Sequence, residues 1–255
     1  MPAPNPDRRA TPRGAHDAKD SLVRVAQDVS GCERCPRLRR WCRRVARDKV
    51  RRFEDQVYWG RPVPGFGDPH ARLLVVGLAP AAHGGNRTGR VFTGDRSGDF
   101  LFAALHRAGF ANQPGSVSAE DGLELRDCYI TAVVKSAPPG NKPSPREIAN
   151  CRAYLVREWA LLPGLRAVLV LGRIALDGLT GMLRVNGFLP PRRSFAFGHG
   201  LEHDLGQGRR LFTSYHPSQQ NTFTGKLTAG DFDRVLAAIR RHLDAAGGRN
   251  RESLV

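Results

Sequence analysis

Four short apolar runs recur along the chain, at residues 73–78, 129–134, 167–171 and 210–215. Each run is long enough for a buried strand and too short for a helix. The second run is rich in β-branched and apolar residues at consecutive positions, which is typical of a strand covered on both faces. We therefore expect four strands in the core of the protein.

Helical patterns fill the intervals between these strands. We expect helices at residues 99–109, 145–162, 173–183 and 229–246. Ser97 or Gly98 can cap the first helix, and Ser144 can cap the second, with Pro145 at its first position and Glu147 in its first turn. Because strands and helices alternate, we expect an α/β fold with three layers, α/β/α, around a central four-stranded parallel sheet.

The ends of the chain differ in composition from this core. Residues 1–20 have no hydrophobic periodicity, so we expect disorder there, and residues 247–255 form a polar tail. Residues 186–210 are rich in Pro, Gly and Arg, which predicts a hairpin or an irregular segment. A single domain over residues 21–246 remains, and it includes a basic N-terminal segment with cysteines.

The sequence also favours one cellular compartment. It contains no apolar run of 18 residues, and its N-terminus lacks the apolar segment of a secretory signal. We expect no membrane segment and a cytoplasmic protein whose five cysteines are reduced or bound to a metal. The Cys32-Glu-Arg-Cys35 spacing alone fits a metal site, a redox pair or two unrelated thiols.

The charge of the chain points to a polyanionic partner. Lys and Arg number 40 against 24 Asp and Glu, a net charge of +16. Residues 34–52 hold ten basic side chains and the single acid Asp48. Only five of the 40 cations are Lys, so part of the arginine excess can reflect coding bias. The net charge, and not any one arginine, therefore indicates a polyanionic partner.

A glycine-rich loop leaves the first predicted strand, where open α/β sheets place their ligands. It matches neither the dinucleotide fingerprint nor the Walker loop. The loops after the first, second and fourth strands all carry polar residues, and such loops gather at one edge of a parallel sheet. We therefore expect Asp95, Asn141 and His216 to converge on one pocket.

Two long motifs, GLAPAAHGGNRTGRVFTGDRSGDFL and HPSQQNTFTGKLT, resemble the family 5 uracil-DNA glycosylases. The APPGNKPSPRE loop and the CxxC pair extend the resemblance over most of residues 30–245. It implies a monofunctional enzyme that hydrolyses the N-glycosidic bond of uracil in DNA and initiates base excision repair. The enzyme would flip the target base out of the DNA and act as a monomer.

The resemblance also implies roles for the three polar residues. Asp95 would activate the attacking water and stabilise the sugar cation, His216 would donate a hydrogen bond to O2 of the leaving uracil, and Asn141 would lie near the sugar or the water. Without the resemblance, the sequence favours structural roles: a helix cap for Asp95, a structural hydrogen bond for His216 and a turn position for Asn141.

Further residues are implied to contact the base or the DNA: Phe92, Gly77, Ala79, Ala132, Gln220, Asn221 and Lys226. Phe92 would stack on the flipped base, with a core position as the alternative. Ala132 stands where the related family 4 carries an Asn that reads uracil. Because discrimination depends on buried polar groups, its loss predicts a broad substrate range that includes hypoxanthine.

Relatives hold a 4Fe–4S cluster with four cysteines, and here Cys32, Cys35 and Cys151 match three of them while Ser136 takes the remaining position. The resemblance therefore implies a labile cluster with three thiolates and Ser136, which would pin the basic N-terminal segment to the sheet. A degraded site without metal is the alternative.

The other two cysteines are poor substitutes for the missing ligand. Cys128 lies eight residues before Ser136 on the same predicted strand, which corresponds to roughly 26 Å. Cys42 could reach the site only if its segment folds back.

Two other functions remain open. The same scaffold could serve as a catalytically reduced damaged-DNA-binding protein or as a uracil-DNA trap, although the presence of both Asp95 and His216 favours catalysis. An iron–sulfur redox protein is disfavoured by the missing fourth cysteine. No Lys in the active-site motifs is placed as a Schiff-base nucleophile, so we expect no strand cleavage.

Overall fold

The computed structural model describes residues 20–252, with side chains for residues 20–245. Four parallel strands form the centre of its sheet in the order β3-β2-β4-β6. They are β2 (Leu73–Gly77), β3 (Cys128–Ala132), β4 (Ala167–Leu171) and β6 (Arg209–Ser214). The predicted parallel core is confirmed, and every position of β2, β3 and β4 is buried.

The sheet has six strands and not four, because an antiparallel strand is added at each edge. The short β1 (Phe66–Gly67) pairs with β3, and β5 (Leu201–Gly206) pairs with β6. Neither edge strand carries an apolar run, which is why the hydrophobic pattern did not reveal them. The segment 186–210, for which a hairpin or an irregular segment was predicted, contains β5, and the hairpin forms between β5 and the expected fourth strand β6. Its turn residues Gln207 and Gly208 both have positive φ, as tight hairpin turns require.

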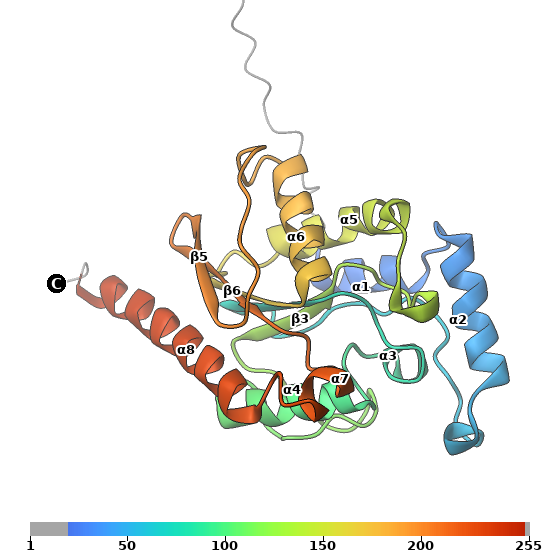
Figure 1. Ribbon diagram of the computed structural model, residues 1–255. Helices are drawn as coiled ribbons and strands as arrows, with labels where there is room; N and C mark the ends of the chain where they lie inside the picture. Colours follow the sequence, from blue (N-terminus) through green and yellow to red (C-terminus); the bar gives the residue numbers. More distant parts are fainter. Residues whose placement is uncertain (1–19, 253–255) are drawn as a thin grey trace, which may run out of the picture.

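Helices cover both faces of the sheet (Figure 1). On one face lie α4 (Arg96–Arg107) and α8 (Ala229–Glu252), whose apolar side chains pack on β-strand residues such as Val75 and Phe212. On the other face lie α5 (Pro145–Ala160) and α6 (Arg173–Val185). Alternate side chains along each central strand enter the two cores, so the expected three-layer α/β/α fold is confirmed.

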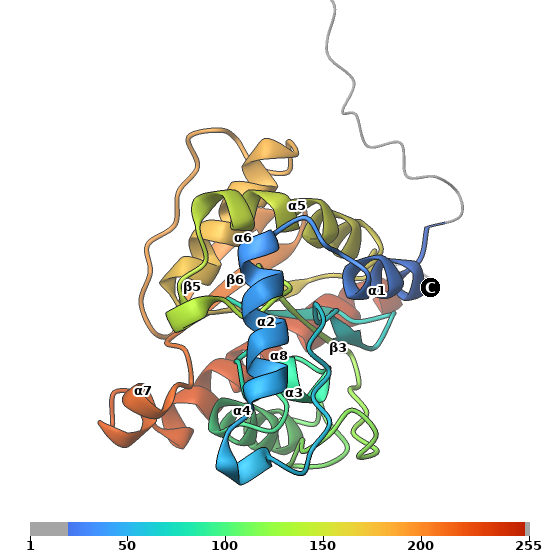
Figure 2. The same ribbon diagram turned by 90° about the vertical axis from the view of Figure 1, so that its right-hand side faces the viewer.

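The N-terminal segment forms two helices against this body. Helix α1 (Leu22–Ser30) packs on α5 through Val25 and Val29. The basic α2 (Pro36–Asp48) crosses one side of the molecule and leads into the 3-10 helix η1 (Arg51–Phe53) (Figure 2). The predicted disorder of the first residues falls largely on 1–19, outside the described part, whereas Asp20 is paired with Arg157 at 2.7 Å.

Two helix boundaries differ from the sequence-based prediction. Helix α4 is capped by Asp95 and not by Ser97 or Gly98, so it begins three residues earlier than expected. Helix α8 continues to Glu252 instead of ending near residue 246. Gly247 and Gly248 weaken a helix by only about 1 kcal/mol each, and no Pro follows to stop it.

Three short elements lie in the loops that follow the parallel strands: α3 (Gly85–Thr88) after β2, the 3-10 helix η2 (Pro139–Asn141) after β3, and α7 (Gln219–Phe223) after β6. Because the strands are parallel, their carboxyl ends meet at one edge of the sheet and bring these elements together. Within residues 20–252, no helix is both long and apolar enough to cross a membrane.

Candidate active site

A cavity of about 300 Å³ opens at this edge of the sheet. It is formed by the loops after β2, β3 and β6, which lie around the point where the strand order reverses and ligands usually bind. The three predicted residues Asp95, Asn141 and His216 all line it. The other lining residues are Leu78, Ala79, Ala81, Phe92, Ser97, Ser218 and Gln219. The expected convergence on one pocket is therefore observed.

The two carboxylate oxygens of Asp95 have different neighbours. Its Oδ1 accepts a hydrogen bond from the backbone N–H of Gly98 at 3.0 Å and so caps α4. Its Oδ2 lies against Gly84, where any Cβ would collide with the carboxylate. Gly84 is therefore required so that the loop can pass close to this acid. The cap and the catalytic interpretations of Asp95 are compatible, because each uses a different oxygen.

The protonation of Asp95 is set by opposing effects. Burial raises the pKa of its carboxyl group, while the N–H groups of Gly98 and Ser97 and the charge of Arg87 lower it, and nearby Asp99 raises it further. A carboxylate with a raised pKa accepts a proton more readily at neutral pH, which suits a general base.

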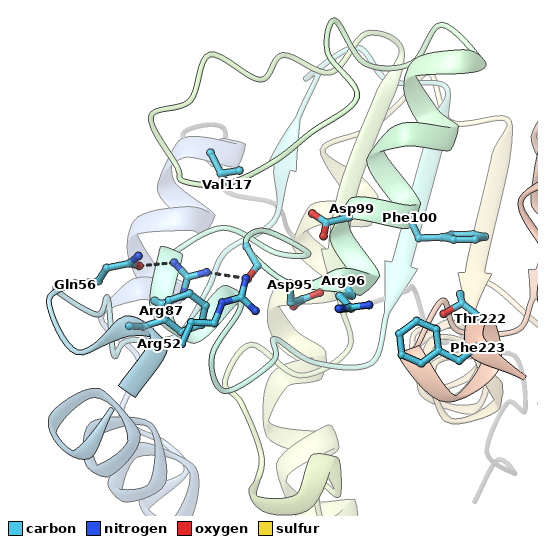
Figure 3. A pocket seen from close by; sticks show the side chains of 12 residues that line it. Arg52, Gln56, Arg87, Asp95, Arg96, Asp99, Phe100, Val117, Thr222 and Phe223 are labelled. Atoms are coloured by element: carbon cyan, nitrogen blue, oxygen red, sulfur yellow. Dashed lines mark hydrogen bonds between the residues drawn. The ribbon is translucent and has the colours of Figure 1, made fainter. Parts of the chain in front are cut away.

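Arg87 is a buried cation behind this acid. Its three nitrogens donate to the carbonyl of His83 at 2.8 Å, to Oε1 of Gln56 at 2.6 Å and to the carbonyl of Gly94 at 2.8 Å. Figure 3 shows the bond to Gln56 beside the Asp95 loop. Since Gly94 directly precedes Asp95, the guanidinium fixes the backbone that carries the acid.

Phe92 is held in an unusual conformation on the wall of the cavity. Its backbone has a φ of 56°, in the left-handed region that bulky residues avoid. Its ring stacks on the imidazole of His216 with centroids 5.8 Å apart. A Cβ at Gly77 would meet the Phe92 ring, so Gly77 serves by leaving room for that ring at the end of β2. Strain of this kind is concentrated at functional sites.

His216 lies two residues after the end of β6 and is neutral at physiological pH. Burial lowers the pKa of its imidazole to about 4. Two groups hold its backbone, because the side-chain amide of Asn221 and the N–H of Ser218 each donate to the His216 carbonyl at 2.8 Å. A neutral imidazole in this position can still donate one N–H to a ligand.

The remaining predicted contact residues are not all in the pocket. Ala79 lines it, whereas Ala132 is buried at the end of β3 and is not among the lining residues. Asn221 points inward to His216 and so positions the histidine. Gln220 is exposed on α7, and the Lys226 ammonium lies 4.7 Å from the centre of the Tyr215 ring.

Three polar wall residues of the cavity, Ser97, Ser218 and Gln219, were not predicted as site residues. Ser97 was expected only as a helix cap and lies in the first turn of α4, whereas Ser218 caps α7. Arg87 was also missed, since no local pattern reveals that its guanidinium binds Gln56, 31 residues earlier, as well as the nearby carbonyls of His83 and Gly94.

The cysteines are free thiols, and three of them approach one another. Burial raises the pKa of the Cys151 thiol most, Lys135 lowers it, and the nearby Cys35 and Cys32 raise it further, to about 11 in all. No group of three or more His, Cys, Asp or Glu side chains in the described part of the chain is arranged to hold a single metal ion. Cys42, within α2, donates to the carbonyl of Ala137 at 3.5 Å, so it lies beside the loop that carries Ser136.

Comparison with known proteins identifies the family. A family model described as the uracil DNA glycosylase superfamily matches residues 64–240, which include every residue that lines the cavity. The chain belongs to the uracil DNA glycosylase superfamily. This membership confirms the expected uracil-DNA glycosylase type of fold and of enzyme.

Several similar proteins within the superfamily are type-5 uracil-DNA glycosylases. The type-5 uracil-DNA glycosylase of Mycobacterium bovis is 51% identical over 222 residues, covering 87% of this chain and 81% of that protein. The type-5 enzyme of Pyrobaculum aerophilum is 47% identical and covers 93% of this chain and 96% of its own. The type-5 enzyme of Thermus thermophilus is 47% identical, and the match covers 84% of this chain and 95% of that protein. The predicted similarity to family 5 is confirmed.

Proposed function

We propose that the protein hydrolyses the N-glycosidic bond that joins uracil to deoxyribose in DNA. One observation carries this proposal: Asp95 and His216 line the same 300 Å³ cavity, beside the stacked ring of Phe92. A flipped pyrimidine placed on Phe92 would have a carboxylate near its sugar and an imidazole near its carbonyl edge.

The reaction then assigns one task to each side chain. The glycosidic bond breaks with its electron pair on uracil N1, and the N–H of His216 stabilises the charge that develops at O2. The oxygen of a water molecule bonds to C1′ of the sugar while Asp95 accepts the water proton. Uracil is then protonated from solvent, and an abasic sugar remains in the strand. Asn141, on the rim of the cavity, would orient the water or the sugar.

We further propose a substrate range that includes deaminated purines such as hypoxanthine. The support is chemical: Leu78, Ala79, Ala81 and Phe92 give the cavity apolar walls, and Ala132 offers no polar side chain. A base that lies against these apolar side chains leaves no polar group of that wall unpaired, so this wall discriminates weakly between bases.

A basic surface beside the cavity would bind the DNA backbone. A second hollow on α2 is lined by Arg37, Arg40, Trp41, Arg43, Arg44, Arg47 and Pro139. Pro139 and Asn141 belong to the same 3-10 helix, so this arginine surface adjoins the rim of the cavity. Phosphate binding by these arginines would make affinity fall with salt.

The decisive experiment is excision from a uracil-containing oligonucleotide, read by alkaline cleavage at the abasic site, with Asp95→Asn as the inactive control. Free uracil and an intact strand before alkali are expected. A covalent protein–DNA adduct on a denaturing gel, or binding without release of uracil, would instead support the trapping or sensing alternative. The same assay with hypoxanthine-containing oligonucleotides tests the proposed substrate range. If no hypoxanthine is excised, that part of the proposal fails.

We also propose a labile 4Fe–4S cluster on Cys32, Cys35, Cys151 and Ser136. Its support is local chemistry: the three thiols approach one another, and N–H groups of Asn150 and Lys135 lie 3.3 Å from the sulfur of Cys35 and 3.5 Å from that of Cys151. Such hydrogen bonds to sulfur tune these clusters. When bound, the cluster would link α1, α2 and α5, and it takes no part in the hydrolysis.

Iron and sulfide content, with absorbance near 400 nm, tests this after anaerobic purification. We expect Ser136→Cys to retain more iron than the native chain and Ser136→Ala to retain less. A folded native protein without iron or colour would overturn the cluster, and equal iron in all three would remove Ser136 as a ligand.

A further inference from the structure

A second and larger cavity, of about 750 Å³, adjoins the first. Asp95 lines both, so the two cavities meet at the acid that faces the sugar in the proposed reaction. Residues of η1, of the first turn of α4 and of α7 form its walls (Figure 3). Neither the motifs nor the reaction assign a role to this space.

The wall formed by α7 carries an aromatic ring that is unusually open to solvent. Phe223 is 68% exposed, more than the exposed aromatics Trp59 at 37% and Phe188 at 42%. The guanidinium of Arg96 lies over the Phe223 ring, 5.1 Å from its centre. An exposed ring with a cation beside it at the mouth of a nucleic-acid site is a stacking platform for a base, because every base has a π face.

The charges in the cavity are separated in a way that suits one nucleotide. Figure 3 places Arg52 and Arg87 at one end, Asp95 and Asp99 in the middle, and Phe223 at the other end. Arg87 already donates from each guanidinium nitrogen. Neither Arg52 nor Arg96 has an ion-pair partner among the described residues, but the Arg96 guanidinium lies over the Phe223 ring. Arg52 is therefore the unpaired cation at the end of the cavity opposite the ring, and we assign the phosphate to it because the carboxylates of Asp95 and Asp99 lie nearer to Arg96.

The connectivity of the DNA strand identifies the group that would occupy the larger cavity. A nucleotide whose base lies in the smaller cavity stays bonded to its neighbours through its phosphates. Because Asp95 faces the sugar of that nucleotide and also lines the larger cavity, the adjoining nucleotide is the nearest group that can enter.

We propose that the larger cavity binds the base of a nucleotide next to the excised one, stacked on Phe223, with its phosphate beside Arg52. This inference rests on the proposed glycosylase function. It differs from a wedge role, in which Phe223 would enter a duplex and replace the flipped base. A stacking site acts on single strands as well, whereas a wedge acts only on duplexes.

The test uses oligonucleotides with one uracil, as single strands and as the matching duplexes, in which the nucleotide on either side is replaced in turn by a base-free tetrahydrofuran analogue. Single-turnover excision gives the half-saturating protein concentration for the native chain, for Phe223→Ala and for the control Phe188→Ala. Phe188 is also an exposed aromatic, but its ring contacts Trp159 and it lines neither cavity.

We expect Phe223→Ala to raise the half-saturating concentration about 5- to 100-fold, and Phe188→Ala to leave it unchanged. The Phe223 effect should vanish when the base on one particular side is absent, which also identifies that side. An effect that persists without either neighbouring base, or that occurs only with duplexes, overturns the proposal, as does the absence of any effect.

Fluorescence anisotropy with the same oligonucleotides separates this proposal from the proposed function. If the native chain does not excise uracil, the function fails, yet binding can still depend on Phe223 and the neighbouring base together. If excision proceeds and Phe223→Ala changes neither binding nor rate, only the neighbouring-base site fails.

Discussion

Asp95 offers a prediction that separates folding from catalysis, because its two oxygens serve different purposes. Oδ1 caps α4 through the N–H of Gly98 at 3.0 Å, and Oδ2 faces Gly84 and the cavity. Asparagine caps a helix as well as aspartate does, whereas alanine cannot. Asp95→Asn thus preserves the cap and removes the base, and Asp95→Ala removes both.

The structure sets the size and sign of each effect. Loss of the cap in Asp95→Ala should cost about 1 kcal/mol of unfolding free energy. Burial raises the pKa of the Asp95 carboxyl, so its ionised form is less stable in the folded than in the unfolded state. This destabilisation is absent below the ordinary pKa of aspartate and grows as the pH rises through the folded-state value. Asp95→Asn should therefore match or exceed the native stability at pH 7.

Urea unfolding at pH 7, together with single-turnover excision of uracil, measures both effects. We expect the stability order Asp95→Asn, native, Asp95→Ala, and a fall in rate of about 10²- to 10⁴-fold in both variants. Asp99→Asn is the matched control, since Asp99 lies in the same helical turn without capping it. Near-native excision by Asp95→Asn would refute the catalytic role, and equal destabilisation by both variants would refute the cap.

Three further predictions concern neighbouring groups. His216→Ala should slow excision by about one to three orders of magnitude. It should also abolish the loss of stability that the native protein shows as the pH falls from 6.5 to about 4, because the unfolded histidine takes up a proton at a higher pH than the folded one. Excision rates and urea unfolding across that range test both effects. Lys135→Met should destabilise by about 3–5 kcal/mol because it leaves Glu158 charged and 0% exposed, and Lys135→Met with Glu158→Leu should recover most of that loss in urea unfolding. Arg87→Met should raise the pKa of Asp95 and shift the acidic limb of the pH–rate profile upward, with a smaller shift for Arg87→Lys; an unchanged limb would show that Arg87 has no electrostatic effect on the acid.

The sequence determined the parallel core and the three polar residues expected to converge on one cavity. Buried strands leave consecutive apolar residues, a local signal that marked β2, β3, β4 and β6 without knowledge of their partners. The rule that parallel strands end at one edge then brought Asp95, Asn141 and His216 together, and the cavity contains all three.

Only the tertiary structure decided how those groups are held. Arg87 finds its acceptors on Gln56, His83 and Gly94, and Lys135 finds Glu158 on a helix 23 residues away. The open ring of Phe223 is part of a motif but acquires a neighbour, Arg96, from another element. Hydrophobic periodicity records which side of an element is buried; it carries no information about which distant polar group lies there, because that depends on packing between elements.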